Sequence, residues 1–439
     1  MTRRPSVGHD RRAPDRPGCP ASHAVLPFRE PPLMNPSGGD PHPANAVLRE
    51  AGAAVPVTLP SGIEGYAVTR HEALRDFLCH PDVAKDARHF AALQRGEVPE
   101  GWPLRTFATV PGMTTADGRD HRRLRAPVAR VFTPRRIAAL RPRVRELTDR
   151  LLDDLAAAAE RGEAGEGVAD LRRHLALPLP INVICELLGV PDRHRERLHA
   201  LSHQIVSTDL TPERVTAANR EMREVLARVV AERRRDRGDD LTSALLSLHE
   251  AGDGRLSEAE LTGTLLLLVV AGHETTLNLI TNAVRALCAH RDQLRLLLDG
   301  TVPWERAVEE TLRWDSPVSH FPFRYPVRDV EVGGTTIPAG APVLASYSAA
   351  GRDPRTHGED ADRFDLTRPA HSRHLSFGHG PHYCLGAPLA RLEATVALER
   401  LFTRFPRLQQ AVPDHDLPRR RSFVSNSTQT LPVRLHPPR

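Results

Sequence analysis

A long apolar segment near residue 265 constrains the fold more than any other feature of this 439-residue chain. Ser257 and Glu260 have the spacing of a capping box, which predicts a helix that begins there and continues to about Ala289. The run TLLLLVVAG inside it is apolar on every side, so we expect this helix to be buried through the protein centre. The run is too short to span a membrane, which requires about 18 apolar residues.

Other segments predict more helices and a small amount of strand. Apolar residues recur at helical spacing in three of them, at 71–78, 136–160 and 212–235. Alternating residues at both ends of the segment 56–68, with Ser61 and Gly62 between them, are typical of a hairpin. Residues 91–115 are rich in proline and glycine, and we expect a long loop there, of a kind that often carries function.

Polar residues interrupt the buried helix at AGHETT. Ala271, Glu274 and Thr275 are separated by three and four positions, which predicts that one helical face presents a small residue, an acid and a hydroxyl together. Two structural explanations compete: the Thr275 hydroxyl can bond to its own helix, and Glu274 can form a salt bridge. A buried carboxylate is costly unless it is paired, and such a cost is common at functional sites.

The segment FGHGPHYCLG contains the cysteine with the strongest functional signal, Cys384. Gly378 and Gly380 allow a sharp turn with positive φ, and Pro388 suits the first turn of a following helix. Amides at the start of that helix favour a thiolate, which is the form that ligates metal. An inert buried cysteine is one alternative. A zinc cluster is another, with the nearby histidines as ligands, but their spacing fits no common zinc pattern: His371, His374, His379 and His382.

These residues carry a resemblance to the cytochrome P-450 family. Phe377, Gly380, Cys384 and Gly386 match its F-x-x-G-x-x-x-C-x-G signature, and the segment AGHETT resembles its A-G-x-[DE]-T-T motif. The similarity extends over about residues 40–439 and implies a mainly α fold with small β-sheets. It also implies haem b as cofactor, held between the long central helix and the loop of Cys384, whose sulfur is the axial ligand of the iron.

The resemblance also assigns roles to individual residues. It implies catalytic roles for Thr275 and Glu274, and a buried structural network of Glu310, Arg313 and Arg363. Cofactor-binding roles are implied for His121, Arg125, Ala271, Gly272, Arg324, Phe377, Gly378, His382, Cys384 and Gly386. The expected substrate pocket comprises Met113, Leu267, Val270, Val318, Ser319, His320, Phe321 and Val424. One position departs from the usual bacterial pattern, because Gly351 stands where asparagine is common.

The activity that this family resemblance implies is a monooxygenase reaction. One oxygen atom of O2 would enter an apolar small molecule such as a steroid, a macrolide or another polyketide or terpenoid. Electrons would come from NAD(P)H through a ferredoxin reductase and a ferredoxin, for which Arg122 and Arg130 could form part of the docking patch. A peroxide-driven enzyme and a non-catalytic haem protein are the alternatives.

Composition bears on partners and compartment. The net charge of +5 includes three charges from the first 17 residues, so the remainder is nearly balanced and we expect no nucleic-acid partner. Five scattered cysteines indicate a reducing compartment, and we expect a cytoplasmic monomer with no membrane association. Residues 1–35 are expected to be a disordered tail, and residues 36–439 a single catalytic domain. Lys85 is the only lysine.

Overall fold

The computed structural model describes residues 32, 34, 39–206, 210–250, 256–369, 374–422 and 424–437. Apart from residues 32 and 34, the segment 1–35 that was expected to be disordered lies outside these residues, as does His371. The described part is mainly helical with small sheets, as the sequence predicted.

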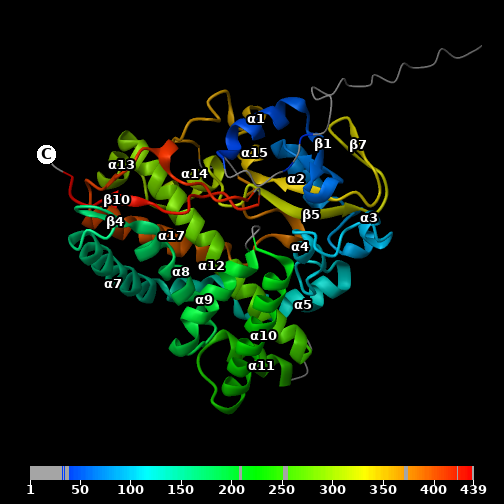
Figure 1. The fold of residues 1–439 in the computed structure, drawn as a ribbon, viewed down its shortest axis with the longest axis horizontal. Coiled ribbons are helices and arrows are strands. Elements are labelled where there is room, and N and C mark those ends of the chain that lie inside the picture. Colours follow the sequence, from blue (N-terminus) through cyan, green and yellow to red (C-terminus); the bar gives the residue numbers. More distant parts are fainter. Residues whose placement is uncertain are drawn as a thin grey trace, which may run out of the picture.

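The longest helices belong to one group, with α12 (Glu258–Ala289) at its centre (Figure 1). Its members are α5 (Gly118–Val131), α6 (Pro134–Ala139), α7 (Arg141–Glu160), α8 (Pro178–Leu187), α9 (Asp192–Val206), α10 (Pro212–Arg235), α11 (Leu241–Glu250), α12 (Glu258–Ala289), α13 (Arg291–Leu298), α14 (Glu305–Trp314) and α17 (Ala387–Arg404). Shorter helices accompany the sheets: α1 (Pro41–Ala51), α2 (His71–Cys79), α3 (Ala91–Gln94), α4 (Arg105–Thr109), α15 (Tyr347–Gly351) and α16 (Pro354–His357). The expected loop at 91–115 therefore contains two short helices, α3 and α4.

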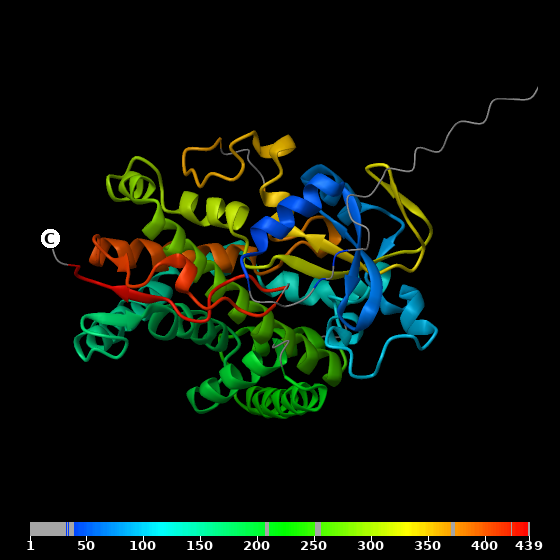
Figure 2. The same cartoon turned by 45° about the horizontal axis from the view of Figure 1, so that its top comes forward.

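Helix α12 runs through the middle of the protein, as the two views in Figures 1 and 2 show. The capping box is present, because Ser257 accepts from the Glu260 amide and Glu260 accepts from the Ser257 amide. The helix packs against α8, α9, α10, α14 and α17. By length and composition it could cross a membrane, but 61% of its most apolar window is buried inside the protein, as in a core helix.

The largest sheet has the strand order β1-β2-β8-β5-β3. These strands are β1 (Ala54–Leu59), β2 (Ile63–Val68), β3 (Val83–Ala84), β5 (His320–Pro326) and β8 (Val343–Ser346). The pairing of Ala54 with Val68 confirms the predicted hairpin, and Ser61 at its turn has φ +64°. Two smaller sheets join β4 (Val168–Asp170), β10 (Pro432–Arg434) and β9 (Gln409–Gln410), and β6 (Val330–Val332) with β7 (Thr335–Ile337).

Candidate active site

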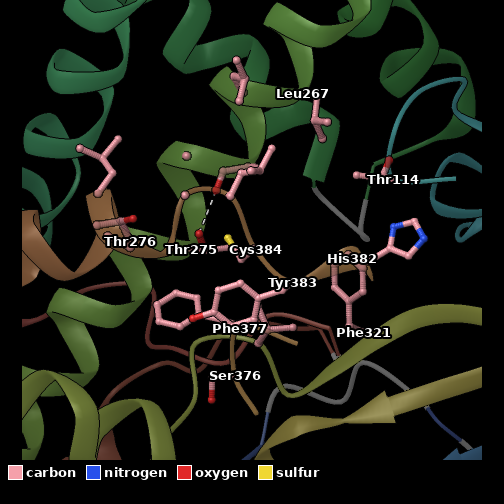
Figure 3. A pocket seen from close by; sticks show the side chains of 18 of the residues that line it. Thr114, Leu267, Thr275, Thr276, Phe321, Ser376, Phe377, His382, Tyr383 and Cys384 are labelled. Atoms are coloured by element: carbon pink, nitrogen blue, oxygen red, sulfur yellow. Dashed lines mark hydrogen bonds between the residues drawn. The ribbon is translucent and has the colours of Figure 1, made fainter. Parts of the chain in front are cut away.

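A cavity lies between α12, the start of β5 and the loop that precedes α17. Figure 3 shows side chains from all three segments turned into it, among them Thr275, Phe321 and Cys384. Loop residues after β3 and before α5 complete its wall, including Lys85 and Met113. The cavity thus brings together segments separated by some 300 residues of sequence.

Cys384 is surrounded by protein yet retains accessible surface, because it is open to this cavity. The Cys384 amide donates to the Phe377 carbonyl at 2.9 Å, and Gly378 and Gly380 have φ values of +73° and +72°. Burial raises the pKa of the Cys384 thiol, while the amides of Gly386 and Ala387 and the charge of Arg125 oppose that rise. Local amides therefore favour the thiolate, and a bound cation would favour it further.

His374 and His382 have other partners than the Cys384 sulfur. His374 lies 3.1 Å from Glu309, and His382 lies 3.8 Å from Asp117. Among the residues that the structure describes, no group of three or more histidine, cysteine and acidic side chains could hold a metal ion. Cys384 therefore suits a metal that a larger cofactor already coordinates.

The polar interruption of α12 is divided between two sides of the helix. Ala271, Gly272 and Thr275 line the cavity, and the Thr275 hydroxyl donates to the Ala271 carbonyl at 2.8 Å. Glu274 is buried away from the cavity lining, 3.2 Å from Arg420 and 3.8 Å from Arg172. The expectation that Glu274 shares the cavity face with Thr275 is wrong, because the acid turns toward two arginines.

Basic groups gather at one end of the cavity. Arg125 from α5, Arg324 from β5, His382 and Lys85 all line it. His121 stands beside them, with its ring centroid 4.1 Å from that of His382 and its buried Nε2 without a hydrogen-bond partner. Burial lowers the pKa of His382 to about 4 despite the nearby Asp117, and it also lowers the pKa values of Lys85 and Arg324. This end of the cavity is suited to a ligand that carries carboxylates.

Comparisons with known proteins agree with this geometry. The family description Cytochrome P-450 matches residues 304–431. The chain is 38% identical to 2-hydroxy-5-methyl-1-naphthoate 7-hydroxylase of Streptomyces carzinostaticus over 94% of this chain and 98% of that protein. It is 40% identical to vitamin D(3) 25-hydroxylase of Pseudonocardia autotrophica, over 91% and 94% of the two chains.

This chain belongs to the cytochrome P-450 family. A solved structure described as testerone-bound CYP154C4 from Streptomyces sp. ATCC 11861 superposes with a TM-score of 0.88 at 41% identity, covering 93% of this chain and 99% of that one. The fold, the haem b cofactor and the monooxygenase class expected from the sequence are thereby confirmed.

The cavity of this cytochrome P-450 fits haem b on chemical grounds. It offers a thiolate ligand at Cys384, small residues at Ala271 and Gly272 where a flat ring can approach, and basic groups for two carboxylates. The buried Nε2 of His121 has no hydrogen-bond partner among the residues that the structure describes, and as an N–H donor it would be satisfied by a haem carboxylate, which offsets a cost of about 1–3 kcal/mol. Gly378 does not line the cavity; its turn places the neighbouring Phe377, which does.

Half of the predicted substrate-pocket residues of this cytochrome P-450 line the cavity, namely Met113, Leu267, Val318 and Phe321. The other half, Val270, Ser319, His320 and Val424, do not line it. His320 alternates away on β5, where its Nδ1 lies 2.9 Å from the Ser346 hydroxyl. Val424 packs in the core around Phe323, and the Ser319 amide donates to the Val424 carbonyl at 2.7 Å.

The buried network of α14 has a different third member from the one predicted. Arg313 donates to both carboxylate oxygens of Glu310 at 2.8 Å. Arg368 approaches Glu310 at 3.3 Å and Asp360 at 3.0 Å, whereas the Arg363 side chain is exposed and only its backbone carbonyl accepts from Arg313. The prediction that Arg363 is the third member of the network is therefore wrong, and Arg368 completes the network.

Several cavity residues of this cytochrome P-450 were missed from the sequence. Thr114, Tyr347, Ser376, Tyr383 and Lys85 all line the cavity. Short segments with no helical or strand period place most of them, so periodicity gave no signal. Lys85 did carry a signal in the sequence, because it is the only lysine in the chain.

Proposed function

We propose that this cytochrome P-450 oxygenates a rigid, steroid-sized apolar molecule bound against α12. The observation that carries the proposal is the apolar cavity lining around Thr275, formed by Leu267 and Leu268 on the same helix and by Val318 and Phe321 at the start of β5. Such a surface binds a hydrophobic skeleton, and only a few polar groups are then needed to fix its orientation. Thr114 supplies one hydroxyl beside this wall.

The relatives support a ring-containing substrate. Those compared above are described as acting on a naphthoate and on vitamin D(3), and the solved relative is described as testerone-bound. Each of these molecules is built on carbon rings and carries few polar groups. A macrolide is the second candidate substrate class.

The proposed roles follow from the contacts. Cys384 binds the iron, and His121, Arg125, Arg324 and His382 bind the haem carboxylates. When bound, haem supplies the iron that takes up O2 and receives electrons, and thiolate ligation favours O–O cleavage. The apolar walls orient the substrate and exclude water from the reacting carbon.

Thr275 is the proposed proton carrier at the cavity surface. Its hydroxyl donates to the Ala271 carbonyl of its own helix. Rotation about the Cα–Cβ bond of Thr275 would break this bond and turn the hydroxyl toward the cavity. Glu274 stands one residue behind it, and Arg420 and Arg172 hold the pKa of this carboxyl below its ordinary value although burial alone would raise it. Glu274 can pass protons to Thr275 only after its side chain leaves Arg420 and Arg172 and turns toward the cavity, so this movement belongs to the proposed role.

A first experiment tests the ligand and the proton carrier. Reduced protein with carbon monoxide is expected to give the red-shifted Soret band of a thiolate-bound haem, and Cys384→Ala is expected to abolish it. Thr275→Ala should retain that band and the binding of substrate while losing product per NADPH consumed. Serine at position 275 keeps the hydroxyl and should restore coupling. A band typical of histidine ligation would overturn the assignment of Cys384.

We also propose a ferredoxin as electron donor, docking where α5 approaches the Cys384 loop. Arg125 donates to the Tyr383 carbonyl and so joins these two segments, and Arg122 is exposed on the same helix. Complementary charge speeds association with an acidic partner. We further propose that the enzyme acts as a monomer in the cytoplasm, where the four described cysteines, all free, stay reduced.

Charge reversal tests the docking site. Arg122→Glu is expected to slow reduction by ferredoxin at low salt, with the difference shrinking as salt screens the charges. Arg407→Glu is the matched control, because Arg407 is exposed beyond the far end of the 18-residue helix α17, about 27 Å of helix away. Equal slowing in both variants would contradict the proposed site. A separate titration of the haem spin state with steroids, macrolides and fused aromatics then identifies the substrate class. If no ring-containing ligand changes the spin state, the proposal of a ring-containing substrate is overturned.

A further inference from the structure

Lys85 is buried at the basic end of the cavity, and no carboxylate within the part of the chain that the structure describes pairs with its ammonium group. The residue directly follows β3, is 4% exposed, and lines the cavity. Its Nζ donates to the Pro322 carbonyl over a long 3.3 Å and lies 5.0 Å from the centre of the Phe321 ring. An ammonium carries three donors, and burying such a charge is costly unless it is paired.

The surroundings of Lys85 contain more positive than negative charge. Arg324 and Arg125 share this end of the cavity, while Asp117 is the nearest acid. The Asp117 carboxylate already accepts from the backbone amides of Lys85 and Asp86, at 2.8–2.9 Å, rather than from the ammonium. Other groups facing this end are the imidazoles of His121 and His382 and the phenol of Tyr347.

The basic end of the cavity carries a surplus of positive charge. Lys85, Arg125 and Arg324 face the single carboxylate Asp117, which leaves a surplus of two positive charges. The other nearby acid, Asp86, is occupied by Arg88 in an exposed pair. A ligand with two carboxylates neutralises the surplus, and haem b carries two.

We infer that Lys85 donates a charge-assisted hydrogen bond to a haem carboxylate, and so joins the cofactor to the segment at Phe321 and Pro322 that walls the substrate pocket. The inference rests on the proposed haem site and adds a residue to it. Phe321 is the point of coupling, because the Lys85 side chain contacts both its ring and the next carbonyl. A substrate carboxylate is the other possible source of the same ligand chemistry.

Haem retention tests the bond directly in the holoenzyme. Lys85→Met is expected to speed transfer of haem to excess apomyoglobin by roughly ten-fold or more, since hydrogen bonds to charged groups are strong. Lys85→Arg should stay close to the wild-type rate because it retains the charge and the donors. Arg88→Met is the control, a cation removed three residues away from an exposed position. A Lys85→Met rate equal to that of the control would overturn the inference.

A second measurement needs no variant and separates the two carboxylate sources. Because Lys85 is the only lysine, growth on lysine labelled with 13C at the ε carbon gives one lysine signal. In substrate-free ferrous carbonyl holoenzyme we expect this group to lose its proton at a pH no lower than that of an ordinary lysine in water, since a carboxylate favours the ammonium. Suppose instead that the lysine loses its proton several pH units lower, and that only an added acidic ligand raises this pH. Lys85 would then bind a substrate carboxylate, and the haem contact would be refuted.

The outcomes also separate this inference from the proposed function. Lys85→Met is expected to keep the thiolate-type carbonyl band, because Cys384 is untouched. If the wild-type protein fails to show that band, the haem-thiolate assignment itself is refuted. If the band is intact but Lys85→Met retains haem as well as the wild type does, only the role of Lys85 is refuted.

Discussion

Replacing Arg368 with glutamine should destabilise the protein far more than the same change at Arg363. The Arg368 guanidinium is 7% exposed, and it donates to the Glu310 and Asp360 side chains and to the backbone carbonyl of His357. Arg363 lies five residues earlier with an exposed side chain. The pair therefore compares a buried and an exposed arginine in one segment.

The loss of unfolding free energy on Arg368→Gln depends on which bonds Glu310 retains in the variant. Breaking a buried ion pair costs about 3–5 kcal/mol because a charge is left stranded. Glu310 keeps its two 2.8 Å bonds to Arg313, so we expect the lower value, about 3 kcal/mol. An exposed substitution such as Arg363→Gln should change stability by no more than about 0.5 kcal/mol.

Calorimetry of the two holoenzyme variants measures the difference. A chain of 439 residues has an unfolding entropy of about 0.9 kcal/mol/K, so 3 kcal/mol corresponds to a shift in Tm of about 3 °C. Arg363→Gln should shift Tm by less than about 1 °C on the same basis. The carbonyl Soret band serves to show that both variants retain haem. Equal shifts, or a larger one for Arg363→Gln, would refute the reasoning and restore the sequence-based assignment.

Two further predictions concern the same region. Gly351→Ala should destabilise the protein measurably in a urea titration, because a Cβ there would lie 2.0 Å from the Arg313 carbonyl oxygen; a neutral result would show that α14 shifts freely. Glu309→Gln should cost less stability at pH 4 than at pH 7. Burial opposes ionisation of Glu309, but hydrogen bonds from His374 and Arg391 lower its pKa to about 2. The stabilisation is thus complete above the ordinary value near 4.5 and is lost as pH falls toward 2, and a cost independent of pH would contradict this sign.

The sequence by itself determined the elements whose signals are local. The capping box of Ser257 and the apolar run after it predicted α12 to within a residue, because helix capping and burial depend on neighbours three and four positions apart. The glycine-bounded segment around Cys384 likewise predicted a sharp turn and a cysteine just ahead of α17, since positive φ values and an early proline are properties of the chain itself.

Only the tertiary structure decided which side chains meet. Glu274 turns to Arg420, almost 150 positions later, and Lys85 lies beside the carbonyl of Pro322, more than 230 positions later. Arg363 and Arg368 look equivalent in sequence, and packing against α14 chooses between them. Charge pairing and burial act through space, so no local pattern along the chain contains them; that is why the elements could be predicted and several of their contacts could not.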